Sequence, residues 1–449
     1  MTFPSHSVVQ TGPPAWWPAR VFYGWALVGA LGLTATVSYG ILSYGFAVFI
    51  APMGAELGWS KAEVTGAFSL AQLIAGVAAI PVGRWVDRHG ARALMTAGSA
   101  LAAILLVAWS EVHSLAAFYA LWAAMGLAMA AVLYEPAFAV VATWFAARRG
   151  RALTVLTFVG GFASVIFVPL ATFLVERHGW RAALLWLAAV YATLTILPHA
   201  LVLRRRPADI GLVPDGASPD GATRASGRTP RGAAAHALSV PAREAVRRRS
   251  FRWLAAAFAL SALTTTAVSV HLVPLLLERG YSAAFAGAAM GVLGLMALPG
   301  RLVFTPLGSR WRRSAVTASI FALGAIACMV LLLTRHPAAV WAFVVLFGAG
   351  FGAITPARAA LVAELYGPLH YGKIAGVLAL LVSLARAVAP VGASLLYSLG
   401  GGVRHGYDVV MFALLALCVA SGVAVLAAGD RDVRAAIAST SAHVVDGIA

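Results

Sequence analysis

Twelve long apolar runs, separated by short polar turns and one longer polar stretch, dominate the chain. Most of them contain about twenty or more apolar residues, the length that an α-helix needs to cross a bilayer. We therefore predict an all-α polytopic membrane protein with twelve transmembrane helices. The predicted helices lie at about 21–50, 61–82, 92–110, 114–144, 151–174, 180–203, 252–277, 283–308, 314–334, 338–365, 372–398 and 405–428.

Composition supports this reading. Of the 449 residues, 61% are hydrophobic and 11% are charged, whereas soluble domains contain roughly 45–50% apolar and about 25% charged residues. Residues 1–20 lack the apolar core of a signal peptide, so we expect the first run to remain as a spanning helix. The two cysteines, Cys328 and Cys418, lie inside apolar runs and indicate neither a disulfide framework nor a metal site.

The formal net charge of +17 could indicate a nucleic-acid partner, but its distribution argues for membrane topology. If the N-terminus is cytoplasmic, 24 of the 33 Lys and Arg residues fall in cytoplasmic segments, 6 in outer loops and 3 within spans. Cytoplasmic loops carry such an excess. We expect both termini in the cytoplasm and the protein in the plasma membrane, which for a bacterium is the inner membrane, with no nucleic-acid partner.

The two halves of the chain repeat several features. Trp59-Ser60 precedes the second run and Tyr281-Ser282 the eighth, while Glu135-Pro136-Ala137 lies in the fourth and Thr355-Pro356-Ala357 in the tenth. Many transporters consist of such repeats, with the substrate bound near the midplane between them.

This pattern predicts four regions. An N-terminal six-helix bundle occupies 1–203, a cytoplasmic linker 204–250, a C-terminal six-helix bundle 251–428 and a cytoplasmic tail 429–449. The polar linker is expected to be partly disordered, and its last part could form a short interfacial helix. We infer no function for the linker.

The turn after the second run contains Gly83, Asp87, Arg88, Gly90 and Arg92. Their spacing resembles the motif G-x-x-x-D-R-x-G-x-R of the major facilitator superfamily. This resemblance implies a gate between the halves. Asp87 could stabilise a helix N-terminus and pair with arginines. The alternative is that these charges only reflect membrane topology.

Further stretches resemble the monocarboxylate-transporter and oxalate–formate-antiporter branch of that superfamily. They are Tyr23-Gly24-Trp25, Glu56-Leu57-Gly58-Trp59-Ser60-Lys61-Ala62-Glu63-Val64, Gly179-Trp180-Arg181 and Arg206-Pro207-Ala208-Asp209-Ile210-Gly211. The resemblance covers both halves. It implies a secondary transporter of small organic anions, such as mono- or dicarboxylates.

Three arginines lie within spans, where a charge usually faces a cavity or a partner. The resemblance implies that Arg386, in the eleventh helix, and Arg301, in the eighth, bind a substrate carboxylate. Arg358 could line the same cavity. The alternatives are a structural ion pair for Arg386 and contact with cytoplasmic headgroups for Arg301 and Arg358. Some relatives carry an aspartate at the position of Ala297 or a lysine near Tyr44, and both are missing from this sequence.

Two further ionisable residues are candidates for proton coupling. Glu135 is the one clearly mid-span carboxylate in the sequence and could carry a proton or form a salt bridge with an arginine. His271 could titrate or serve as a packing residue. The aromatic residues Tyr39, Tyr44 and Phe158 could form the walls of an amphipathic pocket or belong to the core.

We therefore predict a secondary transporter that works by alternating access, coupled to protons or to anion exchange. A proton-driven drug exporter and a non-transporting solute sensor are alternatives. The sequence contains no Walker loop, His-Glu-x-x-His motif or nucleophile elbow, so we expect no enzyme activity, cofactor, metal or nucleotide partner. The expected partners are the lipid bilayer, a small organic anion and, if transport is coupled, protons.

Overall fold

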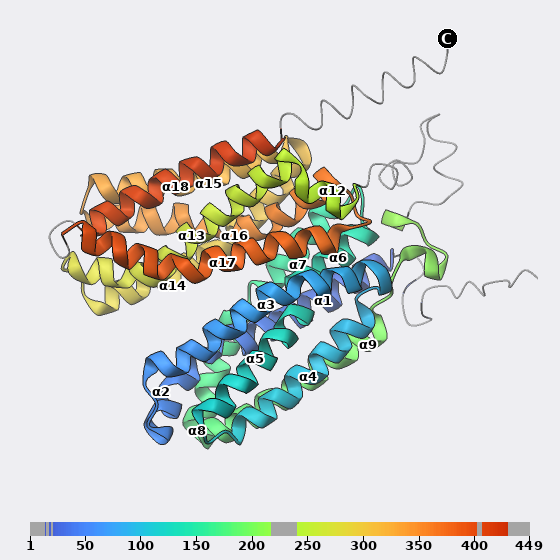
Figure 1. The fold of residues 1–449 in the computed structure, drawn as a ribbon, viewed down its shortest axis with the longest axis horizontal. Helices are drawn as coiled ribbons and strands as arrows, with labels where there is room; N and C mark the ends of the chain where they lie inside the picture. Colours follow the sequence, from blue (N-terminus) through green and yellow to red (C-terminus); the bar gives the residue numbers. More distant parts are fainter. Residues whose placement is uncertain (1–13, 15–17, 19–20, 217–239, 402–405, 430–449) are drawn as a thin grey trace, which may run out of the picture.

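The computed structural model describes residues 14, 18, 21–216, 240–401 and 406–429, and all the regular structure in these ranges is helical. Two bundles lie side by side in Figure 1, one made of α1–α9 and the other of α12–α18. They come together at the end that carries the linker, which we call the linker end, and diverge toward the opposite end, which we call the far end. The predicted fold class is confirmed.

The N-terminal half contains nine α-helices and two π-helical turns in the described residues. They are α1 (Gly24–Tyr39), the π turn Gly40–Tyr44, α2 (Phe46–Leu57), α3 (Lys61–His89), α4 (Arg92–Ser110), α5 (Leu115–Val132), α6 (Tyr134–Trp144), α7 (Arg149–Gly160), α8 (Ala163–Tyr191), the π turn Ala192–Ile196 and α9 (Leu197–Val202).

Short linker helices and six long helices follow. They are the 3₁₀ turns Pro207–Ile210 and Pro214–Gly216, then α12 (Ala242–Arg247), α13 (Arg249–Glu278), α14 (Ala283–Arg310), α15 (Arg313–Leu333), α16 (Pro337–Tyr366), α17 (Tyr371–Leu399) and α18 (Gly406–Gly429). The short helix expected near the end of the linker is present as α12.

The helical stretch from Arg149 to Val202 is 54 residues long and holds two of the predicted spans. Gly179, at φ 76° and ψ 163°, interrupts it, because glycine adopts positive φ without a steric penalty. The described residues contain eleven apolar helical stretches that are long enough to cross a membrane. Because this stretch holds two spans, the total agrees with the predicted twelve.

The second span is longer than predicted. A capping box between Ser60 and Glu63 starts α3, which continues to His89 and ends at Gly90, with φ 80°. Gly83, Asp87 and Arg88 therefore lie in the last two turns of a helix and not in a loop. No proline or glycine in this segment adopts a helix-breaking geometry before Gly90, so the polar residues extend the helix beyond its apolar part.

The fourth span is broken where the tenth is continuous. In the fourth, α5 ends at Val132, Leu133 has a non-helical ψ of −160° and α6 begins at Tyr134. Pro136 favours a break here, because its ring would crowd the carbonyl of Val132 and it has no N–H to donate, although Pro81 and Pro274 lie inside unbroken helices. The matching Pro356 lies inside the unbroken α16.

The halves pack most closely where α3 meets α17. A Cβ on Gly83 would overlap the backbone of Gly372, and one on Gly376 would overlap the backbone of Ala79. These small residues let the two helix backbones touch. The linker end is therefore closed by backbone-to-backbone packing.

The described parts of the linker are fixed to both halves. The Asp215 carboxylate accepts hydrogen bonds from the backbone N–H groups of Ala146, Ala147 and Arg148, at 3.0, 2.7 and 3.1 Å. Val240 N–H donates to the Tyr366 carbonyl at 3.1 Å. The first anchor holds the linker to the N-terminal half and the second holds it to the C-terminal half.

Candidate substrate site

A cavity of about 450 Å³ lies between the two halves. Helices α1, α3, α5, α6 and α7 line it from the N-terminal half, and α13, α14, α16 and α17 from the C-terminal half. Sites for small molecules commonly have volumes of about 300–1,000 Å³. We call this space the central cavity.

The charges of the central cavity are distributed unequally. Arg301, Arg358 and Arg386, all from the C-terminal half, line it together with a single carboxylate, Glu135, from the N-terminal half. This leaves two formal positive charges without compensation by the lining. Such an excess in a low-dielectric enclosure attracts anions.

Arg386 lies in the middle of its helix, fifteen residues after Tyr371 and thirteen before Leu399. Its side chain lines the central cavity and is solvent-accessible there. Within the described residues, no hydrogen bond or ion pair joins its guanidinium to a protein group. A planar guanidinium with open donors can bind a carboxylate through two parallel hydrogen bonds.

Arg358 and Glu135 form an ion pair across the halves. Arg358 Nη2 donates to Glu135 Oε1 at 2.9 Å, and both side chains are only partly exposed. The helix break at Leu133 places Glu135 in the first turn of α6, opposite α16. The salt bridge considered for Glu135 from the sequence is therefore present, and its partner is the third cavity arginine.

Arg301 is held by two backbone carbonyls. Its Nε donates to the Gly352 carbonyl at 3.2 Å and its Nη1 to the Thr157 carbonyl of α7 at 2.5 Å. Pro356 has no N–H to bond to Gly352, four residues earlier, so Arg301 supplies the missing donor. The Gly352 carbonyl is therefore satisfied although the helix has a proline at 356.

The aromatic candidates are divided. Tyr39 and Tyr44 line the central cavity, and the ring of Tyr39 packs against Tyr134 at a centroid distance of 4.6 Å. Phe158 does not line it, because its ring packs edge-to-face on Phe162 at 5.4 Å. Phe158 therefore belongs to the helix packing and not to the cavity wall.

His271 is also outside the central cavity. Its Nε2 lies 3.3 Å from the Pro390 carbonyl, and its Nδ1 lies 3.4 Å from the Tyr407 hydroxyl. Because a carbonyl can only accept, Nε2–H is the donor to Pro390. These contacts place His271 between α13, α17 and α18 as a hydrogen-bonded packing residue.

The motif carboxylate Asp87 caps a helix of the opposite half. Its two oxygens accept hydrogen bonds from the backbone N–H groups of Gly372 and Lys373, at 2.8 and 2.9 Å. These groups belong to the first turn of α17, where unpaired donors and the helix dipole favour a negative charge. Asp87 thus joins α3 to the helix that carries Arg386.

The other motif residues brace the N-terminal half. Arg92 Nε donates to the Ala200 carbonyl at 2.7 Å. Arg88 is exposed, and its carbonyl accepts a hydrogen bond from the Arg205 side chain. A Cβ on Gly90 would press against Arg205. The Arg92 side chain and the Arg88 carbonyl therefore contact the segment that leads into the linker, and neither arginine is paired with Asp87 in the described structure.

Sequence reasoning missed several polar residues of the cavity wall. Ser261, Thr265 and Ser269 of α13 line it, as does Gln72 of α3. The signal was available, since 261, 265 and 269 recur every four residues and therefore share one face of a helix. A polar stripe within an apolar span indicates a surface that does not face lipid.

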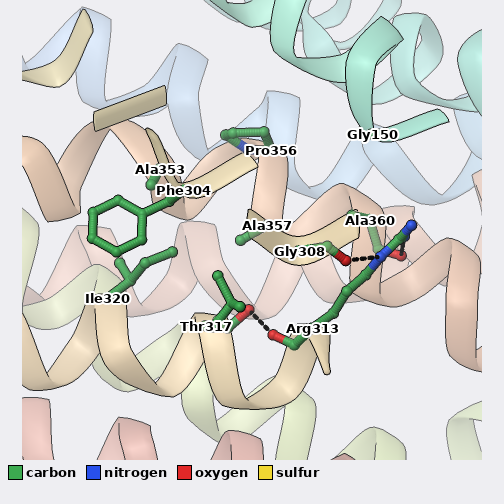
Figure 2. A pocket seen from close by; sticks show the side chains of 11 residues that line it. Gly150, Phe304, Gly308, Arg313, Thr317, Ile320, Ala353, Pro356, Ala357 and Ala360 are labelled. Carbon is green, nitrogen blue, oxygen red and sulfur yellow. Dashed lines mark hydrogen bonds between the residues drawn. The ribbon is translucent and has the colours of Figure 1, made fainter. Parts of the chain in front are cut away.

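A second pocket, between α14, α15 and α16, is shown in Figure 2 and has a volume of about 20 Å³. At one end, Arg313 donates through Nε to the Gly308 carbonyl at 3.2 Å, and it pairs with Glu364 at 3.0 Å. A space of this size holds about one water molecule. It is therefore too small for a substrate, and its arginine is already paired.

Sequence comparison agrees with this architecture. The pattern described as Major Facilitator Superfamily matches residues 32–390, which is most of the chain. The chain belongs to the major facilitator superfamily. Members with this architecture that resemble the chain are transporters, so it is a transporter, not an enzyme, and an integral membrane protein.

Individual superfamily relatives are similar at modest identity. Mouse (Mus musculus) monocarboxylate transporter 11 is 30% identical over 392 residues, which cover 84% of this chain and 79% of the relative. The oxalate:formate antiporter of Oxalobacter formigenes is 29% identical over 166 residues, 36% of this chain and 38% of the relative. The predicted resemblance to this branch of the superfamily is confirmed.

Among solved structures, the superfamily transporter FucP, a fucose:proton symporter of E. coli, was determined in an outward conformation. It has a TM-score of 0.69 and 14% sequence identity, and the match covers 91% of this chain and 99% of FucP. At this identity the similarity shows the fold alone.

Proposed function

We propose that the protein is a secondary transporter of small organic anions, with the substrate carboxylate bound to Arg386. The observation that carries this proposal is the contrast among the three cavity arginines. Arg358 is paired with Glu135 and Arg301 with two carbonyls, whereas Arg386 has open donors. The similarity to a monocarboxylate transporter and to an oxalate:formate antiporter supports an anionic substrate.

The contacts that close the linker end suggest how the central cavity is opened to each side of the membrane in turn. If both termini are cytoplasmic, as the positive-inside rule suggests, the linker end faces the cytoplasm. The Asp87 cap and the glycine contacts of α3 with α17 then close the inner side. Bound anion neutralises part of the positive charge between the halves, which favours their approach at the far end. Transport proceeds by rocking of the six-helix halves around the site.

Glu135 is our proposed proton-coupling residue. Protonation of its carboxylate removes the charge that holds Arg358 at 2.9 Å and adds one positive charge to the cavity. A proton and an anion would then favour each other's binding by linkage. Anion exchange without protons is the alternative for coupling.

The test is uptake of carboxylates by proteoliposomes containing the full chain. Arg386→Gln removes the charge and its paired donors, and we expect uptake to fall by about a hundredfold or more, as when one partner of a buried charge pair is truncated. Arg252→Gln is the matched control, because Arg252 is an exposed helical arginine at the start of α13. Thermal midpoints of both variants verify folding.

Three outcomes would contradict the proposal. Unchanged carboxylate uptake by Arg386→Gln would remove Arg386 from the mechanism. Export of cationic drugs without any carboxylate flux would instead identify a drug exporter, and Arg386-dependent binding without flux would identify a sensor.

A further inference from the structure

One wall of the central cavity is a stripe of hydroxyl groups on α13. Ser261, Thr265 and Ser269 line the cavity at intervals of four residues, so they lie above one another on one helix face. Thr265 and Ser269 are the accessible members, since Ser261 is only 4% exposed. Their oxygens are separated by about 6 Å along the helix axis, at 1.5 Å per residue.

The protons of these two hydroxyls are already used within the helix. Thr265 Oγ1 donates to the Ser261 carbonyl at 3.0 Å, and Ser269 Oγ donates to the Thr265 carbonyl at 2.8 Å. A carbonyl only accepts, and a hydroxyl has a single proton. With these bonds in place, the stripe presents lone pairs to the cavity and accepts hydrogen bonds from ligand groups that donate them.

The stripe lies at the level of Arg386. Both α13 and α17 start at the linker end, and the contact of His271 with the Pro390 carbonyl fixes their relative register. Thr265 lies six residues before His271, and Arg386 lies four residues before Pro390. The difference of two residues is about 3 Å, so one ligand can reach the guanidinium and the stripe together.

The charge of the cavity decides which donor is suitable. An ammonium group would donate well, but three arginines against one glutamate repel a cation at this depth. Ligand hydroxyl groups donate without carrying charge. The combination of a cation and an acceptor stripe therefore favours a carboxylate with hydroxyl groups over an amino acid.

We propose that the transported anion is a polyhydroxy carboxylate, a sugar-acid type of compound, whose carboxylate binds Arg386 and whose hydroxyls donate to Thr265 and Ser269. A chain of about five or six carbons is long enough to place hydroxyls at both positions of the 6 Å spacing. A cavity of about 450 Å³ has room for such a chain. This assignment depends on the proposed function, because it needs Arg386 as the anion-binding residue.

Gluconate and hexanoate test the assignment, because both have six carbons and one carboxylate and they differ in hydroxyls. Dissociation constants are measured by thermal-shift titration of the purified full chain. We expect gluconate to bind at least twentyfold more tightly than hexanoate. Thr265→Val and Ser269→Ala should each weaken gluconate binding about fivefold, the worth of one neutral hydrogen bond, and change hexanoate binding less than twofold.

Thr193→Val is the matched control, since Thr193 makes the same bond to the Ala189 carbonyl, at 2.9 Å, from an exposed position in the N-terminal half. Equal affinity for gluconate and hexanoate, or gluconate affinity unchanged in both stripe variants, would overturn this inference. If Arg386→Gln still abolishes hexanoate binding in that case, the proposed function stands. If neither acid nor any short carboxylate binds, both proposals are wrong.

Discussion

The two halves meet through opposite charges, but these charges are paired to different degrees along the axis of the molecule. At the linker end, Asp87 of the N-terminal half caps the first turn of α17. At the cavity, Glu135 of the N-terminal half pairs with Arg358. Arg386, also at the cavity, has no acidic partner from the N-terminal half among the described residues.

This difference distinguishes the contacts that hold the halves together from the residue that is proposed to bind the substrate. The first two contacts are complete within the protein and hold the halves together, so they need no ligand. The third cation is left for an anion that comes from outside. In the proposed mechanism the halves close around the substrate because its carboxylate supplies the negative charge for Arg386 that no N-terminal residue of the cavity lining supplies.

Among variants that keep Arg386, the largest effect should come from changing either member of the Glu135–Arg358 pair. Glu135→Gln leaves three uncompensated arginines, and we expect carboxylate affinity to rise about tenfold, with its pH dependence reduced. Arg358→Gln should lower carboxylate affinity by a similar factor. The tenfold estimate corresponds to two unit charges about 12 Å apart at an effective dielectric constant of about 20. Binding assays at several pH values would measure the change in affinity.

The double variant Glu135→Gln with Arg358→Gln is the control for this pair. Because the net charge of the cavity returns to that of the wild type, its affinity should return to within about threefold. If all three variants weakened binding equally, the residues would act through the cavity's shape and not its charge.

A smaller effect is expected at the linker end. Asp87→Asn removes the negative charge from the N-terminus of α17, a contribution of about 1 kcal/mol. The inward-open population should therefore increase about fivefold. Labelling of Gln72→Cys, placed in the cavity wall, by a reagent added on the linker side would report this change as a faster rate.

Asp209→Asn is the control variant for Asp87→Asn. Asp209 accepts a hydrogen bond from Arg206 N–H at 3.1 Å, and this bond lies within the linker and does not connect the two halves. Equal labelling rates for wild type and Asp87→Asn would show that this cap does not hold the gate.

Charge-conserving substitutions should distinguish the two ligand-binding candidates on α14 and α17. Arg301→Lys keeps the charge but cannot reach the Gly352 and Thr157 carbonyls together, so we expect a stability loss of about 0.5–1 kcal/mol with affinity within threefold. Arg386→Lys should weaken affinity without lowering the thermal midpoint. The reverse pattern would make Arg301 the main substrate ligand.

The smallest effect is expected from residues that the structure places outside the cavity. Phe158→Leu and His271→Gln should each change carboxylate affinity less than twofold, because neither side chain lines the cavity wall. Parallel binding titrations would check this, and a tenfold change in either would require a wider site than the one described.

The fold was predictable because each span carries its own signal. Apolar length, loop charge and the Gly83–Arg92 motif report on single segments, so no knowledge of packing was needed. Cavity position was also predictable for Arg386, since its distance from both helix ends is a property of sequence.

The pairing of cavity charges was not predictable in the same way. Which carboxylate meets which arginine depends on the approach of α6 to α16, and the two paired residues are 223 positions apart in the sequence. Pro136 and Pro356 have similar local sequences, yet one helix breaks beside its proline and the other is continuous. Arg301 donates to the Gly352 carbonyl that Pro356 leaves without its helical partner, a contact that no local pattern predicts.

The two linker anchors have a consequence for how the protein could be divided. Asp215 and Val240 each tie the chain to its own half, and the 24 residues between them, 216–239, can span up to about 80 Å when extended. A connection of this reach leaves the halves free to rock as proposed. Two polypeptides separated within this interval and produced together should reassemble into an active carrier.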